Sequence, residues 1–204
     1  ERSFQLHATD IHLDPNEAGL RVRLRVDGML HDVLQVPPEQ SLQMVSRVKL
    51  MAKLNMVKAL NLALHQEMER DQDVLVIGED VGVDGGVFRV TEDLHPTFGS
   101  KRVIDSPLAE AAIIGTSIGM ALYGLKPVSE IQFSGFAFQC FHQIENHAAR
   151  YRQRSQGRFH CQMVMRMPYG GGVRALGHHS RGGGQVYAHI PGLKRVISSG
   201  PSTA

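Results

Sequence analysis

The sequence has few cysteines and little net charge, and each scarcity excludes a class of protein. Only two cysteines occur in 204 residues. They form no CxxC pair, which argues against a disulfide framework and for a reducing compartment. A formal net charge of +2 argues against a dedicated nucleic-acid or membrane binder. No charged-then-apolar leader and no run of about 18 apolar residues occurs. We therefore expect a soluble, cytoplasmic, globular protein without nucleic-acid or membrane partners.

Motifs for ATP hydrolysis and for metal binding are also absent. The chain has no GxxxxGK[ST] segment, and so no loop of backbone amides with a lysine that holds phosphates. It has 11 histidines but no HExxH motif. The adjacent pair His178 and His179 would diverge on a strand and lacks the spacing of metal ligands. We expect no metal site within this chain.

From residue 57 onward, helical and strand-like segments alternate. Strands separated by helices imply right-handed crossovers, and hence a doubly wound parallel α/β sheet. The pattern predicts helices over 57–70, 109–123 and 136–154, and strands over 74–77, 102–104, 127–133, 163–167 and 196–198.

The first 50 residues have a different pattern. Residues 10–14 and 20–31 alternate strictly between apolar and polar side chains, and Asp27-Gly28 is a two-residue turn signal. We expect a half-buried antiparallel hairpin, ended by Pro37-Pro38 and followed by a helix over 42–54. Three arginines (Arg21, Arg23 and Arg25) share one strand face, which pattern alone predicts to be solvated. Without a linker after it, the helical pattern can continue unbroken over 42–68.

One carboxylate stands at a strand-to-helix junction. The apolar run 102–104 stops at Asp105, and Ser106-Pro107 predicts a helix start with a cap residue and a proline in the first turn. Glu110 then lies in the opening turns, where α/β proteins place ligands. Spacing alone favours a plainer interpretation, because acids at helix N-termini complement the macrodipole.

A resemblance changes that balance. It is carried by residues 57–64 (VKALNLAL), 76–81 (VIGEDV), 85–92 (GGVFRVTE), 102–110 (RVIDSPLAE), 130–136 (EIQFSGF), 147–152 (HAARYR), 166–172 (RMPYGGG) and 189–194 (HIPGLK). In this order they resemble the beta subunit of the thiamine-diphosphate-dependent decarboxylating component of pyruvate dehydrogenase and related 2-oxo acid dehydrogenases. The resemblance implies that residues 56–204 are a C-terminally truncated pyrimidine-binding domain.

The resemblance implies a role for two catalytic residues. Glu110 matches the carboxyl group that hydrogen-bonds the aminopyrimidine of thiamine diphosphate and so promotes loss of the thiazolium proton. His179 matches the histidine that faces the substrate and the incoming lipoyl group, a task that suits imidazole near neutral pH. A solvated loop pair of His178 and His179 remains the alternative.

Three further residues are implied to contact the cofactor. Phe136 matches an aromatic that packs against the aminopyrimidine ring, although a core phenylalanine gives the same pattern. Glu79 matches an acid near the cofactor, and an ordinary strand-end acid is an equally good interpretation. Gln132 is expected to line the same pocket.

The same resemblance implies the partners and the reaction. Thiamine diphosphate would be shared with an alpha subunit, which also holds the Mg²⁺, in a heterotetramer of two alpha and two beta subunits. The reaction would be oxidative decarboxylation of a 2-oxo acid, with pyruvate favoured over branched-chain acids or acetoin. The acyl group would pass to a lipoyl-bearing acyltransferase, and this chain alone would be inactive.

Residues 1–52 resemble a different family. Residues 7–15 (HATDIHLDP), 20–31 (LRVRLRVDGMLH) and 45–52 (VSRVKLMA) are similar to the small domain that precedes the nucleotide-binding core in the motor ATPases of type II secretion and type IV pilus assembly. We expect a junction near residues 51–56. Two alternatives to a dehydrogenase subunit follow: an interaction fragment of a secretion ATPase, or a chimeric fragment without activity.

Overall fold

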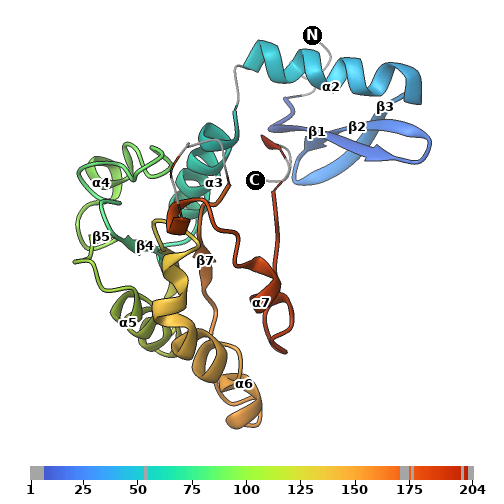
Figure 1. The fold of residues 1–204 in the computed structure, drawn as a ribbon. Coiled ribbons are helices and arrows are strands. Elements are labelled where there is room, and N and C mark those ends of the chain that lie inside the picture. Colours follow the sequence, from blue (N-terminus) through green and yellow to red (C-terminus); the bar gives the residue numbers. More distant parts are fainter. Residues whose placement is uncertain (1–6, 53–54, 171–174, 176, 199, 202–204) are drawn as a thin grey trace. The chain divides into compact units, whose positions relative to one another are not determined.

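The computed structural model describes residues 7–52, 55–170, 175, 177–198 and 200–201 (Figure 1). It divides into two compact units, Glu1–Asn55 and Met56–Ala204. Helix α2 (Pro38–Ala52) belongs to the first unit, and α3 (Met56–Arg70) begins the second. Asn55 is not helical, so the expectation of one unbroken helix over 42–68 is wrong.

The first unit is a three-stranded antiparallel sheet with one helix. Strands β1 (Asp10–Asn16), β2 (Gly19–Val26) and β3 (Met29–Val36) pair in chain order. The predicted hairpin is confirmed as β2–β3, and its turn at Asp27 and Gly28 has φ values of 50° and 80°. Positive φ at both positions is what a type I′ turn requires, because its twist matches that of the strands.

The two faces of this small sheet divide apolar from charged side chains. Leu20, Val22 and Val36 form the buried core, against which side chains of α2 pack. Arg23 and Arg25 form ion pairs across the sheet with Asp14 and Asp10 of β1, at 2.7 and 3.2 Å. The period-2 pattern of β2 thus places one set of side chains in a core and the other on the charged face.

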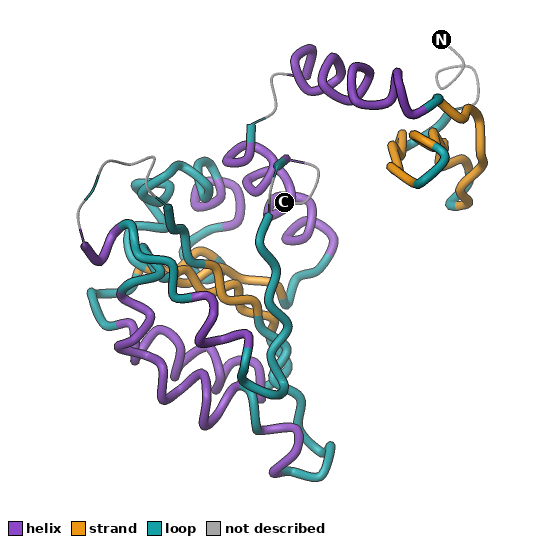
Figure 2. The backbone as a smooth tube through the Cα atoms, turned by 45° about the vertical axis from the view of Figure 1, so that its right-hand side comes forward, coloured by secondary structure: helices purple, strands orange, loops and turns teal. Residues whose placement is uncertain are grey.

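The second unit is built on a four-stranded parallel sheet. Its strands are β4 (Val74–Gly78), β5 (Val103–Asp105), β6 (Lys126–Glu130) and β7 (Val164–Arg166), in the spatial order β5-β4-β6-β7. All three pairings are parallel. Figure 2 shows the strands enclosed by helical segments. Consecutive parallel strands require crossovers, and the intervening helices supply them.

Both faces of β4 are covered, and its five residues are all buried. Leu75 and Ile77 belong to the core that includes residues of α5 (Glu110–Leu122). Val74 and Val76 belong to the opposite core, which includes Met68 of α3 and a residue of α4 (Leu94–Phe98). Helices on both faces of a parallel sheet make this the doubly wound α/β fold that the sequence predicts.

The predicted helix over 136–154 is divided into three segments. A 3₁₀ segment covers Phe136–Cys140, a π-helical segment covers Gln143–Ala148, and the short helix α6 covers Tyr151–Arg154. A repeat of three residues brings Ala137 and Cys140 to one face, where both are completely buried. Core packing therefore overrides the α-helical period in this stretch.

Two other local predictions are wrong. Residues 196–198 form no strand, and Val196 is 79% exposed. Ser106 does not cap α5, because the helix begins at Glu110 with Ala109 at its N-cap, and the Ser106 hydroxyl donates to the Pro107 carbonyl instead. Among the described residues, no helix has the length and apolar character needed to span a bilayer.

Candidate functional site

The carboxyl ends of the parallel strands meet at one edge of the second sheet and carry buried polar residues. Glu79 follows β4 directly and is 6% exposed, and Glu130 ends β6 and is 1% exposed. Glu110 begins α5, the crossover helix between β5 and β6, and is 4% exposed. Such an edge is where open α/β sheets bind ligands, because the loops leaving the strands diverge there.

Glu79 and Glu110 lie within electrostatic range of each other, although the sequence separates them by a helix and a strand. Burial raises the pKa of the Glu79 carboxyl, and the charges of Glu110 and Asp80 raise it further. Glu79 Oε1 is buried without a hydrogen-bond partner. Within the described part of the chain, neither Glu79 nor Glu110 forms an ion pair. Two buried carboxyls without a cation favour a shared proton or a ligand that donates hydrogen bonds.

An aromatic cluster gathers beside this edge. The ring of Phe133 lies edge-on to the rings of Phe136 and Phe88, at centroid distances of 5.7 and 5.8 Å. The imidazole of His179 lies 4.6 Å from the Phe133 ring and 5.1 Å from the Phe136 ring, again nearly perpendicular to both. The structure thus brings together two predicted residues, Phe136 and His179, and adds Phe88 and Phe133.

The carboxyls and the aromatic cluster adjoin the same elements. Helix α5, which begins with Glu110, packs against the 3₁₀ segment that Phe136 begins. Gln132 Nε2 donates to Asp80 Oδ2 at 2.6 Å, which ties the segment after β6 to the residue next to Glu79. Glu79, Gln132, Phe136, His179 and Glu110 therefore lie in the turns, 3₁₀ segments and helix start around one sheet edge.

Sequence reasoning missed a buried ion pair at this edge. Arg166 Nε donates to Glu130 Oε2 at 3.1 Å, and the two residues are register partners at the ends of β6 and β7. Glu130 Oε1 and the hydroxyl oxygen of Thr91 are both buried without a hydrogen-bond partner. A partial signal was present in the sequence, since Arg166 ends the strand Val-Met-Arg, whose other residues are apolar.

The cysteines do not contribute a nucleophile. Burial raises the pKa of the Cys140 thiol to about 12, with a further contribution from the charge of Glu110. Burial also raises the pKa of Cys161. Both remain protonated near neutral pH and act as small apolar residues.

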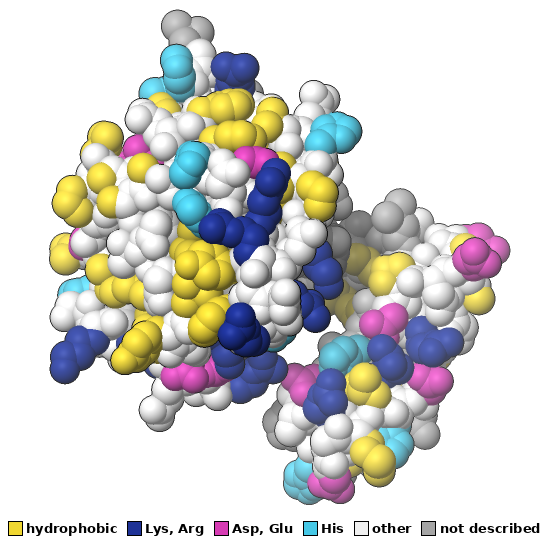
Figure 3. Space-filling view, turned by 90° about the horizontal axis from the view of Figure 1, so that it is seen from below, with side chains coloured by type: hydrophobic (Ala, Val, Ile, Leu, Met, Phe, Trp, Pro, Cys, Tyr) yellow, Lys and Arg dark blue, Asp and Glu magenta, His cyan; other side chains and the backbone are white. Residues whose placement is uncertain are grey.

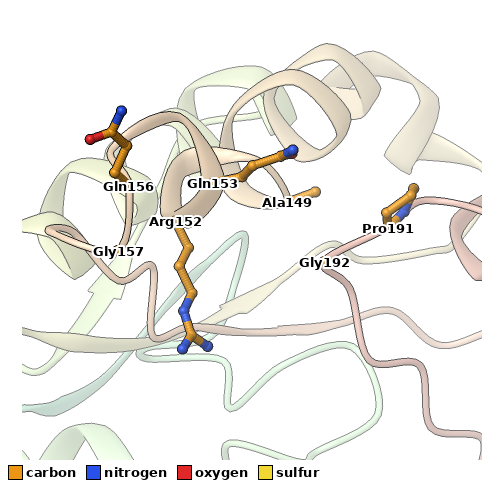
Figure 4. Close-up of a pocket in the computed structure, with 7 residues that line it drawn as sticks. All are labelled: Ala149, Arg152, Gln153, Gln156, Gly157, Pro191 and Gly192. Atoms are coloured by element: carbon orange, nitrogen blue, oxygen red, sulfur yellow. The ribbon is translucent and has the colours of Figure 1, made fainter.

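The second unit also has a surface hollow of about 440 Å³ (Figure 4). It is lined by Ala149, by residues of α6 and the turn after it, and by Pro191 and Gly192. None of the five predicted site residues lines it. Elsewhere the second unit exposes apolar side chains, including Phe159, Val164 and Tyr169. Figure 3 shows hydrophobic side chains next to Lys and Arg on one of its faces.

The comparison with protein families agrees with this architecture. The protein-family model described as "Transketolase, pyrimidine binding domain" matches residues 52–204 of the sequence. The chain belongs to this family. A second family model, described as "Type II/IV secretion system protein", matches the N-terminal residues 2–60. The resemblances seen in the two parts of the sequence are therefore both found by the family models.

Curated relatives of the transketolase-type domain are dehydrogenase subunits. The chain is 50% identical to "Pyruvate dehydrogenase E1 component subunit beta" of Acholeplasma laidlawii, over 76% of this chain and 47% of the relative. It is 50% identical to "3-methyl-2-oxobutanoate dehydrogenase subunit beta" of Mycobacterium tuberculosis, over 74% and 43%. It is 47% identical to "2-oxoisovalerate dehydrogenase subunit beta" of Bacillus subtilis, over 76% and 47%. The chain spans about half the length of these relatives.

Proposed function

We propose that residues 56–204 act as the pyrimidine-binding part of the beta subunit of a thiamine-diphosphate-dependent 2-oxo acid dehydrogenase. The observation that carries the proposal is the position of Glu110. Its carboxyl is buried at the edge where the parallel strands end, it raises the pKa of a second buried acid, Glu79, and its helix packs against the 3₁₀ segment that Phe136 begins. Relatives of about 50% identity named as such subunits support the same assignment.

The residues at this edge suit an aminopyrimidine ring. Such a ring presents nitrogen atoms that pair with a carboxyl group and two faces that pack against aromatic side chains. Glu110 offers a buried carboxyl, and the unpartnered Oε1 of Glu79 lies at the same edge. Phe136 is half-buried, so part of its ring remains available for contact. When bound, thiamine diphosphate would supply the carbon nucleophile for decarboxylation.

The protein side chains then have distinct roles. Glu110 would hydrogen-bond the pyrimidine ring nitrogen and hold the ring in its reactive protonation state. Phe136 would pack on the ring, and Gln132 would keep Asp80 and the Glu79 segment in place. The exposed imidazole of His179 is accessible to a substrate and to a lipoyl group, and it can donate or accept a proton.

The proposal includes partners. The Gly-Asp-Gly type of motif that holds Mg²⁺ and diphosphate is absent from the sequence, so an alpha subunit would supply that half of the site. We propose the family heterotetramer of two alpha and two beta subunits, and a lipoyl-bearing acyltransferase as the acyl acceptor. The substrate is a 2-oxo acid, with pyruvate the first to test. Strand β7, at the edge of the sheet, exposes Val164 and is available for contacts.

Calorimetry with an alpha subunit tests the role of Glu110. Titration of the mixed subunits with Mg²⁺ and thiamine diphosphate is expected to show binding that falls about 10- to 100-fold in Glu110→Gln, because a charged hydrogen bond contributes about 1.5–3 kcal/mol. The matched control is Glu92→Gln, at an exposed position of the same unit. Equal affinity of wild type and Glu110→Gln would overturn the assignment.

The first unit supports a second candidate function. A sheet-and-helix unit over residues 1–52 that matches the secretion-system model suggests an interaction module, distinct from the dehydrogenase part over 56–204. This candidate predicts that binding to a secretion-platform protein survives deletion of residues 57–204. Loss of that binding on deletion would count against it. The chain lacks the phosphate-binding loop, so no ATP hydrolysis is proposed.

A further inference from the structure

We propose that Ser134 and Gly135 form a seat for the segment 177–183, and that this seat positions the imidazole of His179 against Phe133 and Phe136. Its relevance to catalysis rests on the function proposed for His179. The contacts that define the seat are independent of that function.

The first contact is the packing of the His178 backbone on Gly135. An ideal Cβ placed on Gly135 would lie 2.1 Å from the carbonyl oxygen of His178 and 3.0 Å from its Cα. The backbone of His178 therefore occupies the space that any side chain at position 135 needs. Gly135 has φ −65°, which every residue adopts readily, so backbone conformation does not call for glycine here. The close approach of the two backbones does.

The second contact is a hydrogen bond from the other end of the segment. The backbone N–H of Gly183 donates to the hydroxyl of Ser134 at 3.2 Å, and Ser134 is only 5% exposed. The N–H of Ser134 in turn donates to the carbonyl of Pro168 at 2.9 Å. The hydroxyl is thus fixed in the core of the second unit, and it holds the segment beyond His179.

The two contacts bracket a stretch whose other side-chain contacts include those of Ser180, which donates to the carbonyl of Ala175, and of Arg181, which lies 5.2 Å from the Phe138 ring centroid. Gly177, His178 and His179 are all exposed, and glycines occupy positions 182 and 183. Glycine loses more backbone entropy on ordering than other residues, so such a segment needs external anchors. With both anchors in place, the His179 ring lies edge-on to Phe133 at 4.6 Å and to Phe136 at 5.1 Å.

Proton NMR of the full chain tests the seat, because the currents of two nearby aromatic rings displace the His179 ring-proton resonances. His179→Gln assigns those resonances by their disappearance. In wild type we expect them to be displaced from those of the exposed His160. Gly135→Ala and Ser134→Ala are expected to remove most of that displacement, and Ser134→Thr, which keeps a hydroxyl, to retain it.

Two control variants separate positioning from general destabilisation. Gly119→Ala adds a methyl group that meets no atom within 4 Å. Ser129→Ala removes a buried hydroxyl that bonds Ser117 in the core, at 2.7 Å, and not the segment 177–183. Both are expected to leave the His179 resonances unchanged. Ser134→Ala introduces no clash, so it tests the proposal even where Gly135→Ala prevents folding.

The outcomes are distinct from those of the cofactor titration. Undisplaced His179 resonances in wild type, or displacement that persists in Ser134→Ala, would overturn the seat. Failure of the dehydrogenase assignment would appear instead as equal thiamine diphosphate binding by wild type and Glu110→Gln. That result would leave the His179 resonances and the seat unaffected.

Discussion

The imidazole of His179 lies edge-on to the ring of Phe136, with centroids 5.1 Å apart and ring planes at 77°. The two residues come from separate 3₁₀ segments, Gly177–His179 and Phe136–Cys140. The resemblance predicted each of these two residues separately as a site residue. The structure makes them neighbours, so a molecule that packs on Phe136 would also be within reach of the histidine.

Glu79 is expected to make stability fall as the pH rises. Its folded-state pKa is raised above the ordinary 4.5, so the unfolded chain releases this proton at a lower pH than the folded chain does. Stability from this group is complete below pH 4.5 and is lost as the pH rises through the raised folded-state value. Glu79→Gln removes the charge, so we expect it to be more stable than wild type at pH 7 to 8.

Urea unfolding at several pH values measures this effect. The difference between Glu79→Gln and wild type is expected to shrink toward pH 4, where the carboxyl is protonated in both states. Because Glu110 contributes to the shift, the difference should also be smaller in a Glu110→Gln background. A difference that stays constant from pH 4 to 8 would contradict the assigned cause. The exposed Glu92→Gln gives the baseline for loss of one charge.

Removing one partner of the Glu130–Arg166 pair is expected to lower the free energy of unfolding strongly, whereas replacing both partners with apolar residues is expected to lower it little. The Glu130 side chain is 2% exposed, so Arg166→Met leaves a buried carboxylate without its cation. We expect a loss of about 3–5 kcal/mol in the free energy of unfolding. The double variant Glu130→Leu with Arg166→Met is expected to recover most of that loss, because no charge then remains buried.

Denaturant unfolding of the two single variants and the double variant gives the coupling between them. The control is Arg70→Met, which breaks an exposed ion pair with Glu67 and is expected to change stability little. If the effects of the two single variants simply add in the double variant, the pair does not act as a unit.

Replacement of Arg102 by lysine is expected to destabilise the second unit. Its guanidinium donates to the carbonyls of Met68, Asp71 and Val74 at 2.6–3.0 Å, and it lies 5.1 Å from the Phe98 ring centroid. Lysine keeps the charge but lacks the planar fork that reaches several acceptors at once. Arg102→Lys should therefore cost about 2 kcal/mol.

Thermal unfolding checks this value, since about 2 kcal/mol lowers the Tm of a chain of this size by roughly 4–8 °C. Arg152→Lys, at an exposed position of α6, is expected to leave the Tm unchanged. Equal Tm values for Arg102→Lys and wild type would show that the carbonyl contacts contribute nothing.

Local sequence patterns determined most of the regular structure. The alternation of β2 and its Asp27-Gly28 turn specify the hairpin, and the short apolar run of β4 specifies a buried strand. These predictions hold because side-chain period and turn chemistry act over a few residues. The position of Glu110 near the start of a helix was predicted for the same reason, but the N-cap residue of that helix was not predicted correctly.

Tertiary packing decided what local pattern does not encode. Residues 136–154 have a helical pattern, yet burial of Ala137 and Cys140 imposes a 3₁₀ segment. Three pairs join residues from different elements: Glu79 lies within electrostatic range of Glu110, Glu130 is bonded to Arg166, and Gly135 packs against His178. Such contacts depend on which strands lie side by side and on how closely two backbones approach. Those properties belong to the assembled sheet and its covering helices, because parallel strands become neighbours only after the chain between them has crossed over.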